Sequence, residues 1–338
     1  MPAAPLPLGY NTYCLRSLRW PDARHLGFAA EQKLDAIFLQ DSLDPRAADP
    51  AHWKEVGETA ERLGLHLETG GSGLLPRTAE GLDTSIATLR RNIERAAAMG
   101  SRYVRGLLAS NRASLPTTVE QSVEWALKIL RSVRQDLSGR GMKVIIEVHK
   151  DLQAWELRQV IEAAGTDVTG VYLDTGNPVF VLEHPMTTFE TLWPYVQSVH
   201  LRDSAIYMHP KGVAVQWVPL GEGIFDFKTF VAAVAEKCPN VHVYNKPITG
   251  RPPEVIPYLD PNHWKSYPGA RAAELARFLD WARTGRPYEG HVVIEDLANR
   301  QTPPQFLEAV QFQQRDHVLR GLDYAKKELG LGRRWRAA

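Results

Sequence analysis

The sequence has little cysteine and little net charge. Its 338 residues include two cysteines, Cys14 and Cys238, whose placement forms neither a zinc-binding spacing nor a disulfide framework, so we expect a reducing compartment. The 40 Lys and Arg residues against 39 Asp and Glu leave a net charge of +1, and no run of like charges is long enough to follow a phosphate backbone. These absences argue against nucleic acid as the main partner.

Long hydrophobic runs are also missing. No stretch of about 18 or more apolar residues occurs, and the first ten residues, MPAAPLPLGY, lack a basic start followed by an apolar segment. We therefore expect a cytoplasmic protein with no membrane partner. With 44% apolar and 23% charged residues, the composition is that of a globular protein that can bury a full core.

Short β-rich segments alternate with longer segments of helical spacing, which is the pattern of parallel strands joined by crossover helices. The candidate strands are 9–14, 36–41, 65–70, 103–108, 144–149, 170–176, 198–203 and 241–246. Eight strands, each entered after a helix, predict a (β/α)8 TIM barrel, whereas a doubly wound sheet would lack an obvious dinucleotide-binding turn. We expect a single TIM-barrel domain over residues 1–338.

Two further segments follow the predicted barrel. Residues 247–290 are rich in Pro and Trp and too long for a tight loop, so we expect an extension over one barrel mouth. Residues 304–328 predict a terminal helix that packs on the barrel wall. Four aromatic residues of the extension could either line the mouth or simply pack on the barrel: Trp264, Tyr267, Trp281 and Tyr288.

The fifth predicted strand ends in VIIEVHKD, which places Glu147 and His149 two positions apart. Residues two apart share one face of a strand, and in a barrel that face is the interior. Alone, the motif also fits a strand-end Glu paired with a basic residue and a hydrogen-bonded core His.

The next two strands add similar side chains. Asp174 ends VYLD, and His200 and Arg202 share one face of SVHLRD. Three consecutive strands thus deliver a carboxylate or an imidazole near their C-terminal ends, where barrel enzymes build active sites. Oxygen and nitrogen ligands without thiolate suit Mn²⁺, Mg²⁺, Co²⁺ or Zn²⁺. We infer one divalent metal ion, bound by Glu147, Asp174 and His200.

The fourth metal ligand is open at this stage. The segment 241–246 ends in Asn245 and Lys246, where a carboxylate would be expected, while HVVIEDL offers Glu295 after a β-branched run. Either that later segment is the eighth strand or it folds over the mouth. Glu295 is the candidate fourth ligand, and a solvated or capping carboxylate is the alternative.

The segments VIIEVH, GVYLDTGNPVFVLEHP, SVHLRDS and VPLGEGIFDF resemble the xylose-isomerase-like barrel superfamily, often described as sugar phosphate isomerases/epimerases, over about residues 8–246. The resemblance implies that Glu147, Asp174 and His200 are metal ligands, with manganese the first choice of metal. It also implies a small sugar or glycoside as substrate, with three candidate contacts: Asn177, Arg202 and Asp203.

The sequence departs from the superfamily at the fourth ligand. In tagatose-epimerase-type enzymes two metal-binding Glu residues form the acid/base pair, so Asn245 or Lys246 in place of the second would remove half of the proton relay. The E-x-H motif and the extension resemble a narrower branch, the catalytic subunit of bacterial C-glycoside deglycosidases, which act on 3-oxo-glycosides. That likeness implies His149 as the base and a smaller β subunit as partner; a homo-oligomer is the alternative.

These features lead to a metal-dependent carbohydrate enzyme that removes a proton next to a carbonyl. A metal-bound carbonyl stabilises the resulting enolate, and an imidazole with an unperturbed pKa of about 6.5 is a better base than a metal-bound Glu. Expulsion of a β substituent would make the protein a C-glycoside deglycosidase or related lyase, and return of the proton a keto-sugar isomerase or 3-epimerase. A DNA-repair endonuclease on the same barrel would need more metal ligands and a basic groove, which the net charge disfavours.

Overall fold

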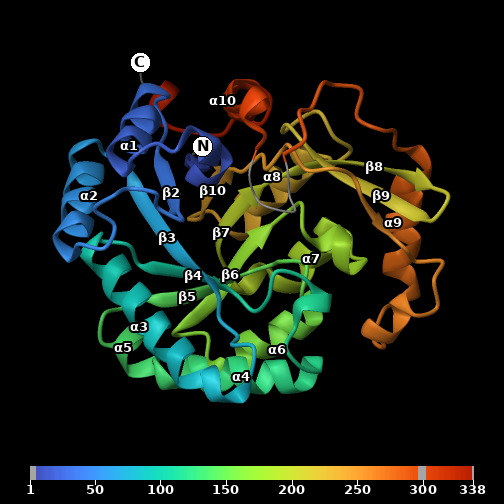
Figure 1. Cartoon of the computed structure of the whole chain (residues 1–338), viewed down its shortest axis with the longest axis horizontal. Coiled ribbons are helices and arrows are strands. Elements are labelled where there is room, and N and C mark those ends of the chain that lie inside the picture. Colours follow the sequence, from blue (N-terminus) through green and yellow to red (C-terminus); the bar gives the residue numbers. More distant parts are fainter. Residues whose placement is uncertain (1–4, 296–301, 337–338) are drawn as a thin grey trace.

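Eight parallel strands close into a barrel in the computed structural model, which describes residues 5–295 and 302–336 (Figure 1). The strand order around the barrel is β1-β10-β7-β6-β5-β4-β3-β2. The strands are β1 (Leu8–Asn11), β2 (Ala36–Gln40), β3 (His66–Gly73), β4 (Tyr103–Leu107), β5 (Lys143–Glu147), β6 (Thr169–Asp174), β7 (Val196–Leu201) and β10 (His242–Asn245). All eight overlap the segments predicted from the sequence, so the TIM-barrel prediction is confirmed.

An outer ring of helices covers the barrel. It consists of α1 (Asp22–Glu31), α2 (Pro50–Arg62), α3 (Leu82–Ala98), α4 (Val119–Ser132), α5 (Arg134–Ser138), α6 (Ala154–Ala164), α7 (Pro185–Leu192) and α8 (Phe227–Lys237). In α4 the buried residues Ser122, Ala126, Ile129 and Leu130 recur at helical spacing, and the Thr118 side chain caps the first turn. Each helix thus turns one apolar face to the strands.

The strands divide their side chains between the helices and the barrel interior. Val144 and Ile146 of β5 belong to the core beneath the helices, whereas Ile145 packs inside the barrel against Phe38, Tyr172 and Tyr244. The aromatic rings therefore fill the middle of the barrel. The next inward position after Ile145 is Glu147, so the alternation places this carboxylate at the C-terminal end of the interior.

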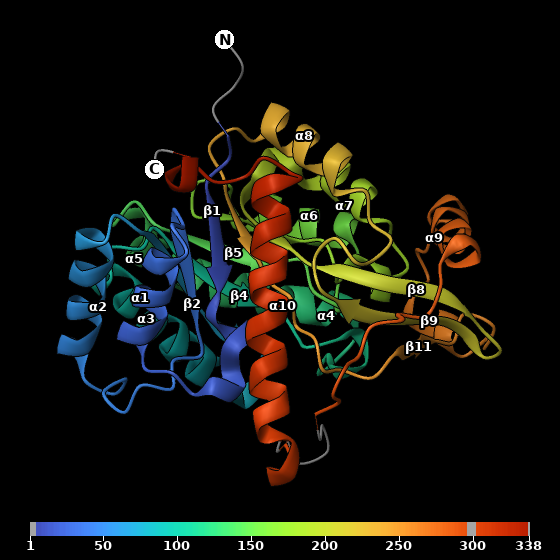
Figure 2. The ribbon, with the colours of Figure 1, turned by 90° about the horizontal axis from the view of Figure 1, so that it is seen from above.

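A small antiparallel sheet projects beyond the barrel. It is formed by β8 (Asp203–His209), β9 (Gly212–Val218) and β11 (Glu254–Ile256), in the order β11-β9-β8. Helix α9 (Ala272–Thr284) packs against β8, as Figure 2 shows at the edge of the molecule. The β8–β9 hairpin was not predicted from the sequence. It carries part of the cavity wall described below.

Helix α10 (Leu307–Lys327) lies along the barrel wall beside the turn of 3-10 helix η1 (Thr12–Leu18) and β10 (Figure 2). Asn245 of β10 donates a hydrogen bond to the carbonyl of Val318 on this helix, with a distance of 3.0 Å. Asn245 thus points outward from the barrel. No helix in the described part of the chain combines the length and the apolar character needed to cross a membrane.

Candidate functional site

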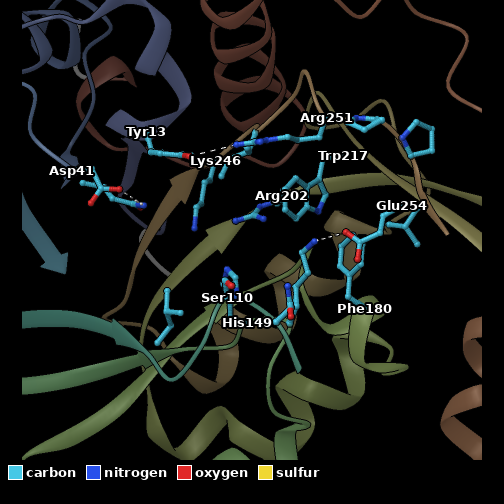
Figure 3. A pocket seen from close by; sticks show the side chains of 18 of the residues that line it. Tyr13, Asp41, Ser110, His149, Phe180, Arg202, Trp217, Lys246, Arg251 and Glu254 are labelled. Atoms are coloured by element: carbon cyan, nitrogen blue, oxygen red, sulfur yellow. Dashed lines mark hydrogen bonds and ion pairs between the residues drawn. The ribbon is translucent and has the colours of Figure 1, made fainter. Parts of the chain in front are cut away.

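A cavity of about 540 Å³ opens at the C-terminal mouth of the barrel (Figure 3). Its lining includes Arg105 from within β4, and Arg202 and Lys246, which directly follow β7 and β10. Its wall includes Trp217 of the β8–β9 hairpin and the segment 251–254 of the extension. Parts far apart in the sequence therefore enclose one space, and the extension lies over the mouth as expected.

The structure brings Glu147, Asp174 and His200 together at this end of the barrel. One ligand atom from each lies within 4.8 Å of the other two, and all three side chains are buried. Asp174 and His200 are directly paired in the register of β6 and β7. Spacing alone would let this group hold a metal ion.

Lys246 follows β10 directly, and its ammonium lies among these three side chains. Its Nζ atom is 2.7 Å from Oε1 of Glu147, 3.1 Å from Nδ1 of His200 and 3.5 Å from Oδ2 of Asp174. The lysine side chain is 2% exposed. Of the two residues considered for the fourth position, Lys246 therefore points inward and Asn245 outward.

Two arginines complete the contacts of the carboxylates. Arg105 of β4 donates to Oε2 of Glu147, and Arg202 donates to Oδ2 of Asp174 at 2.8 Å. The remaining Asp174 oxygen accepts the backbone N–H of Gly176 at 2.9 Å. The two carboxylates are thus matched by three side-chain cations, counting Lys246.

The titration of this cluster follows from burial and charge. Burial acts to raise the pKa of Glu147, but Arg105 and Lys246 overcome it and hold the pKa well below its usual value. Burial, followed by the charge of Lys246, lowers the pKa of His200 well below its usual value. The imidazole of His200 is therefore neutral at pH 7. Burial raises the pKa of Asp174 and lowers the pKa of Lys246. Two carboxylates and three cations give the cluster a formal charge of +1.

The residues around this position do not fit a divalent metal ion in the arrangement that the structure shows. The ammonium of Lys246 faces the ligand atom of each candidate ligand, and an added ion would raise a buried charge that is already positive. The oxygen and nitrogen atoms of Glu147, Asp174 and His200 are suitable metal ligands, but the ammonium of Lys246 occupies the space between them.

His149 lies just beyond β5 and lines the cavity. The backbone N–H of Val148 continues the strand pairing to the carbonyl of Tyr172, which holds the loop in place. The half-buried imidazole has no hydrogen-bond partner for its Nδ1 atom among the described residues. Burial lowers the pKa of His149 to about 3, so the ring is neutral at pH 7 and has a free lone pair.

Asn177 holds the side chain of Arg202 in place through hydrogen bonds. Nη1 of Arg202 donates to Oδ1 of Asn177 at 3.2 Å, and Nδ2 of Asn177 donates to the carbonyl of Val148 at 3.0 Å. The guanidinium carbon lies 4.3 Å from the ring centroid of Trp217. Arg202 reaches the cavity, whereas Asn177 is fully buried and holds it from behind. A Cβ at Gly176 would lie 2.6 Å from Cδ of Arg202, which explains the glycine in DTGNP.

Asp203 and Glu295 lie outside the group around Lys246. The Asp203 carboxylate accepts backbone N–H groups of Ser204, Gly221 and Gly223 at 2.8 to 3.0 Å, and so ties down the loop after β9. Glu295 accepts hydrogen bonds from Arg16 at 2.8 Å and from Gln314 at 2.7 Å. The eighth barrel strand is β10, so the segment that carries Glu295 is not a barrel strand. The Glu295 carboxylate instead bridges Arg16 of η1 and Gln314 of α10.

Sequence reasoning missed Arg105 and the aromatic wall of the cavity. Arg105 interrupts the apolar strand YVRGLL at an inward position, which is a signal for a buried ion pair. The cavity is lined by Tyr13, Phe180 and Trp217, not by the aromatic residues of the extension. Tyr267 donates a hydrogen bond from its hydroxyl to the carbonyl of Phe180, and the ring of Trp281 packs against the ring of His184. These two residues therefore hold the extension on the barrel.

The fold agrees with the comparisons with known proteins. The sequence matches the family described as xylose isomerase-like TIM barrel over residues 22–243, and the chain belongs to that family. A curated relative, the 3-oxo-isoapionate decarboxylase of Pectobacterium atrosepticum, is 25% identical over 231 residues, which cover 66% of this chain and 78% of that protein.

Solved structures share the fold at low identity. The 3-keto-D-glucoside 4-epimerase of E. coli matches with a TM-score of 0.57 and 12% identity, covering 81% of this chain and 99% of that one. The IOLI protein, solved with a bound zinc atom, matches with a TM-score of 0.59 and 13% identity, covering 82% and 98%. At these identities the two structures show a shared fold alone.

Proposed function

We propose that the protein removes the proton next to the carbonyl of a 3-oxo sugar and then expels the group on the neighbouring carbon, as in the cleavage of a 3-oxo-glycoside. One observation carries this proposal. The His149 imidazole, whose Nδ1 atom has no hydrogen-bond partner among the described residues, lines the same cavity as the cationic side chains of Lys246 and Arg202 (Figure 3). A base and a stabiliser of negative charge are the two groups that the reaction needs.

The proposed first step is proton transfer to His149. A neutral imidazole with a free lone pair accepts the proton from the carbon next to the carbonyl, and the C–H electron pair moves into the enolate. Lys246 and Arg202 are placed to donate hydrogen bonds to the enolate oxygen. Charge that develops on this oxygen is then met by donors that buried ion pairs hold in place.

In the second step the enolate electrons return to form a carbon–carbon double bond, while the bond to the β substituent breaks. The departing group takes up the proton that His149 accepted, which returns the imidazole to its neutral form. Phe180 and Trp217 supply apolar walls for a flat aglycone, and the Lys150 ammonium lies 3.9 Å from the ring centroid of Phe180.

Elimination is favoured over epimerisation because Glu147, the carboxylate two residues before His149, is already bound by two cations. A 3-epimerase of the expected type needs a second carboxylate for the opposite face of the sugar. Glu147 is bound through Oε2 by Arg105 and through Oε1 by Lys246. A keto-sugar isomerase or epimerase remains the alternative that the test below separates.

The curated relative supports the substrate class. Its name describes decarboxylation of a 3-oxo carbohydrate acid. Loss of carbon dioxide from a 3-oxo acid also leaves an enolate, so the same cations would serve that reaction. One divalent metal ion, with manganese first, stays a prediction, as does a smaller β subunit or a homo-oligomer, and no step of the proposal depends on any of them.

The test is incubation of the purified protein with a 3-oxo-glucoside of an aromatic aglycone in D₂O, followed by NMR. We expect release of the aglycone, together with deuterium next to the carbonyl in recovered substrate. Deuterium without aglycone release would indicate an isomerase or epimerase. Absence of both with 3-oxo-glucosides and simple ketoses would contradict the proposal. Size-exclusion chromatography with light scattering would test the partner predictions.

A further inference from the structure

We infer that the ammonium of Lys246 stands in the position that the family resemblance assigns to a divalent metal ion, so that this site works with a side-chain cation in place of a resident metal. The inference deepens the proposed function and rests on it in one respect, because it names the group that meets the carbonyl oxygen of the substrate. The presence or absence of a metal site at Lys246 can be tested without any substrate.

Lys246 already contacts the three atoms whose lone pairs would bind a metal ion. A metal ion would use a lone pair from each of three atoms, namely Oε1 of Glu147, Oδ2 of Asp174 and Nδ1 of His200. The Lys246 ammonium lies 2.7, 3.5 and 3.1 Å from these same atoms. An ammonium has three N–H donors, so one lysine can satisfy the set that one ion would otherwise satisfy.

The buried group around Lys246 contains more positive than negative side chains. Glu147 and Asp174 supply two negative charges, and Arg105, Arg202 and Lys246 supply three positive ones, all from side chains at most 4% exposed. A divalent ion added to this buried group would have no further carboxylate to balance it. Buried charge without a counter-charge is unfavourable, so the native side chains disfavour the ion.

The strand pairing of β10 directs the Lys246 side chain into the barrel. The backbone N–H of Lys246 bonds to the carbonyl of Leu201 at 3.0 Å, which continues the pairing of β10 with β7. Tyr244 points into the barrel, so Lys246, two residues on, points inward as well. The lysine therefore reaches the cluster from the strand position at which the family resemblance places a glutamate.

The proposed role needs no covalent step. When the His149 imidazole takes the carbon-bound proton, the enolate oxygen becomes negative. The Lys246 ammonium then turns the N–H of its longest contact, the one to Oδ2 of Asp174 at 3.5 Å, to this oxygen, while Arg202 keeps its hydrogen bond to Oδ2. The ammonium keeps its protons throughout. Lys246 lines the cavity, which gives its Nζ atom access to a bound oxygen (Figure 3).

The decisive measurement is binding of Mn²⁺ to chelator-treated protein, with free Mn²⁺ followed by electron paramagnetic resonance. Two other groups among the described residues have ligand spacing, so the relevant quantity is the binding that Glu147→Gln removes. We expect the wild type to show none. Lys246→Glu should bind about one equivalent, because this substitution removes two units of positive charge, which a divalent ion returns, and supplies a further carboxylate.

A matched control separates position from charge. Lys150 lines the same cavity and pairs with Glu254 at 2.6 Å at the rim. Lys150→Glu makes the same change in charge away from the three ligand atoms, so it should not produce Glu147-dependent binding. Circular dichroism would establish that each variant is folded.

Two results would overturn the inference. One is a wild type that binds an equivalent of Mn²⁺ and loses it in Glu147→Gln; the other is a folded Lys246→Glu variant that binds none. If Lys246→Glu does not fold, the wild-type comparison decides alone. Deuterium exchange into a 3-oxo-glucoside that appears only after Mn²⁺ is added would contradict the inference and leave the proposed function standing. If no deuterium exchange occurs under any condition and the wild type shows no Glu147-dependent Mn²⁺ binding, the proposed function is contradicted and the inference about Lys246 stands.

Discussion

Nη2 of Arg202 lies 2.8 Å from Oδ2 of Asp174, although the two side chains are 1% and 0% exposed. Breaking a buried ion pair leaves the other charge without compensation, which typically costs about 3–5 kcal/mol. We therefore predict that Arg202→Met lowers the free energy of unfolding by about that amount, measured by urea denaturation. Because the loss comes from Oδ2 of Asp174, which loses its 2.8 Å donor and keeps only Lys246 at 3.5 Å, the double variant with Asp174→Asn should be less destabilised than the sum of the two single variants. Strict additivity would mean that the pair contributes nothing to stability.

His149 gives a prediction of the opposite kind. Its Nδ1 atom has no partner among the described residues, so the side chain can be removed at little cost in stability. We predict that His149→Ala lowers kcat for deuterium exchange by about 10²- to 10⁴-fold, the usual contribution of a general base, and leaves the thermal midpoint nearly unchanged. Ser110→Ala, a change in the same cavity wall, is the control and should keep most of the activity. Full activity in His149→Ala would rule out the assigned role.

The sequence predicted the barrel because strand and helix periodicities are local properties. Glu147, Asp174 and His200 were found for the same reason, since alternation along each strand decides which side chains face the interior. The sequence also showed Lys246 at the eighth strand but not its role. Distances between side chains on β5, β6, β7 and β10 depend on barrel closure, and no local pattern contains them.

Two other features depended on contacts distant in the sequence. The segment HVVIEDL has strand-like composition, but Glu295 is bound by Arg16, which lies 279 residues earlier. The β8–β9 hairpin was missed, although His209 to Gly212, with a positive φ of 147° at Gly212, forms a turn between two β-rich runs. The hairpin brings Trp217 to the cavity, so that wall could not be placed from the sequence.

The environment of Asp203 predicts a structural effect in place of a loss of substrate binding. Its carboxylate accepts N–H groups from the loop that contains Gly221 and Gly223, and Asp203 does not line the cavity. Asp203→Ala removes the acceptor of these part-buried hydrogen bonds, which contribute about 0.5–1.5 kcal/mol each. We predict a clear fall in the urea midpoint with KM for the 3-oxo-glucoside changed less than about twofold. Raised KM at unchanged stability would restore the substrate contact expected from the sequence.

Glu183 predicts a pH dependence of stability that is separate from the cavity. Burial raises the pKa of this carboxyl from 4.5 to about 7, opposed by hydrogen bonds from the Ala154 N–H and the Thr188 hydroxyl. The neighbouring acids Glu274 and Glu156 raise it further, although Glu156 is itself paired with Arg112.

The folded protein therefore holds a proton on Glu183 that the unfolded chain has lost above pH 4.5, and its stability falls as the pH rises from about 4.5 to 7. Glu183→Gln removes this titration and keeps an oxygen for the Ala154 N–H. We predict that the variant gains stability over the wild type across this range, by up to about 3 kcal/mol at pH 8. Urea denaturation at pH 5 and pH 8 measures the change. Glu190→Gln, an exposed carboxylate of the same helix region, should show no such difference. A Glu183→Gln gain that is equal at both pH values would show that the carboxyl does not titrate between them.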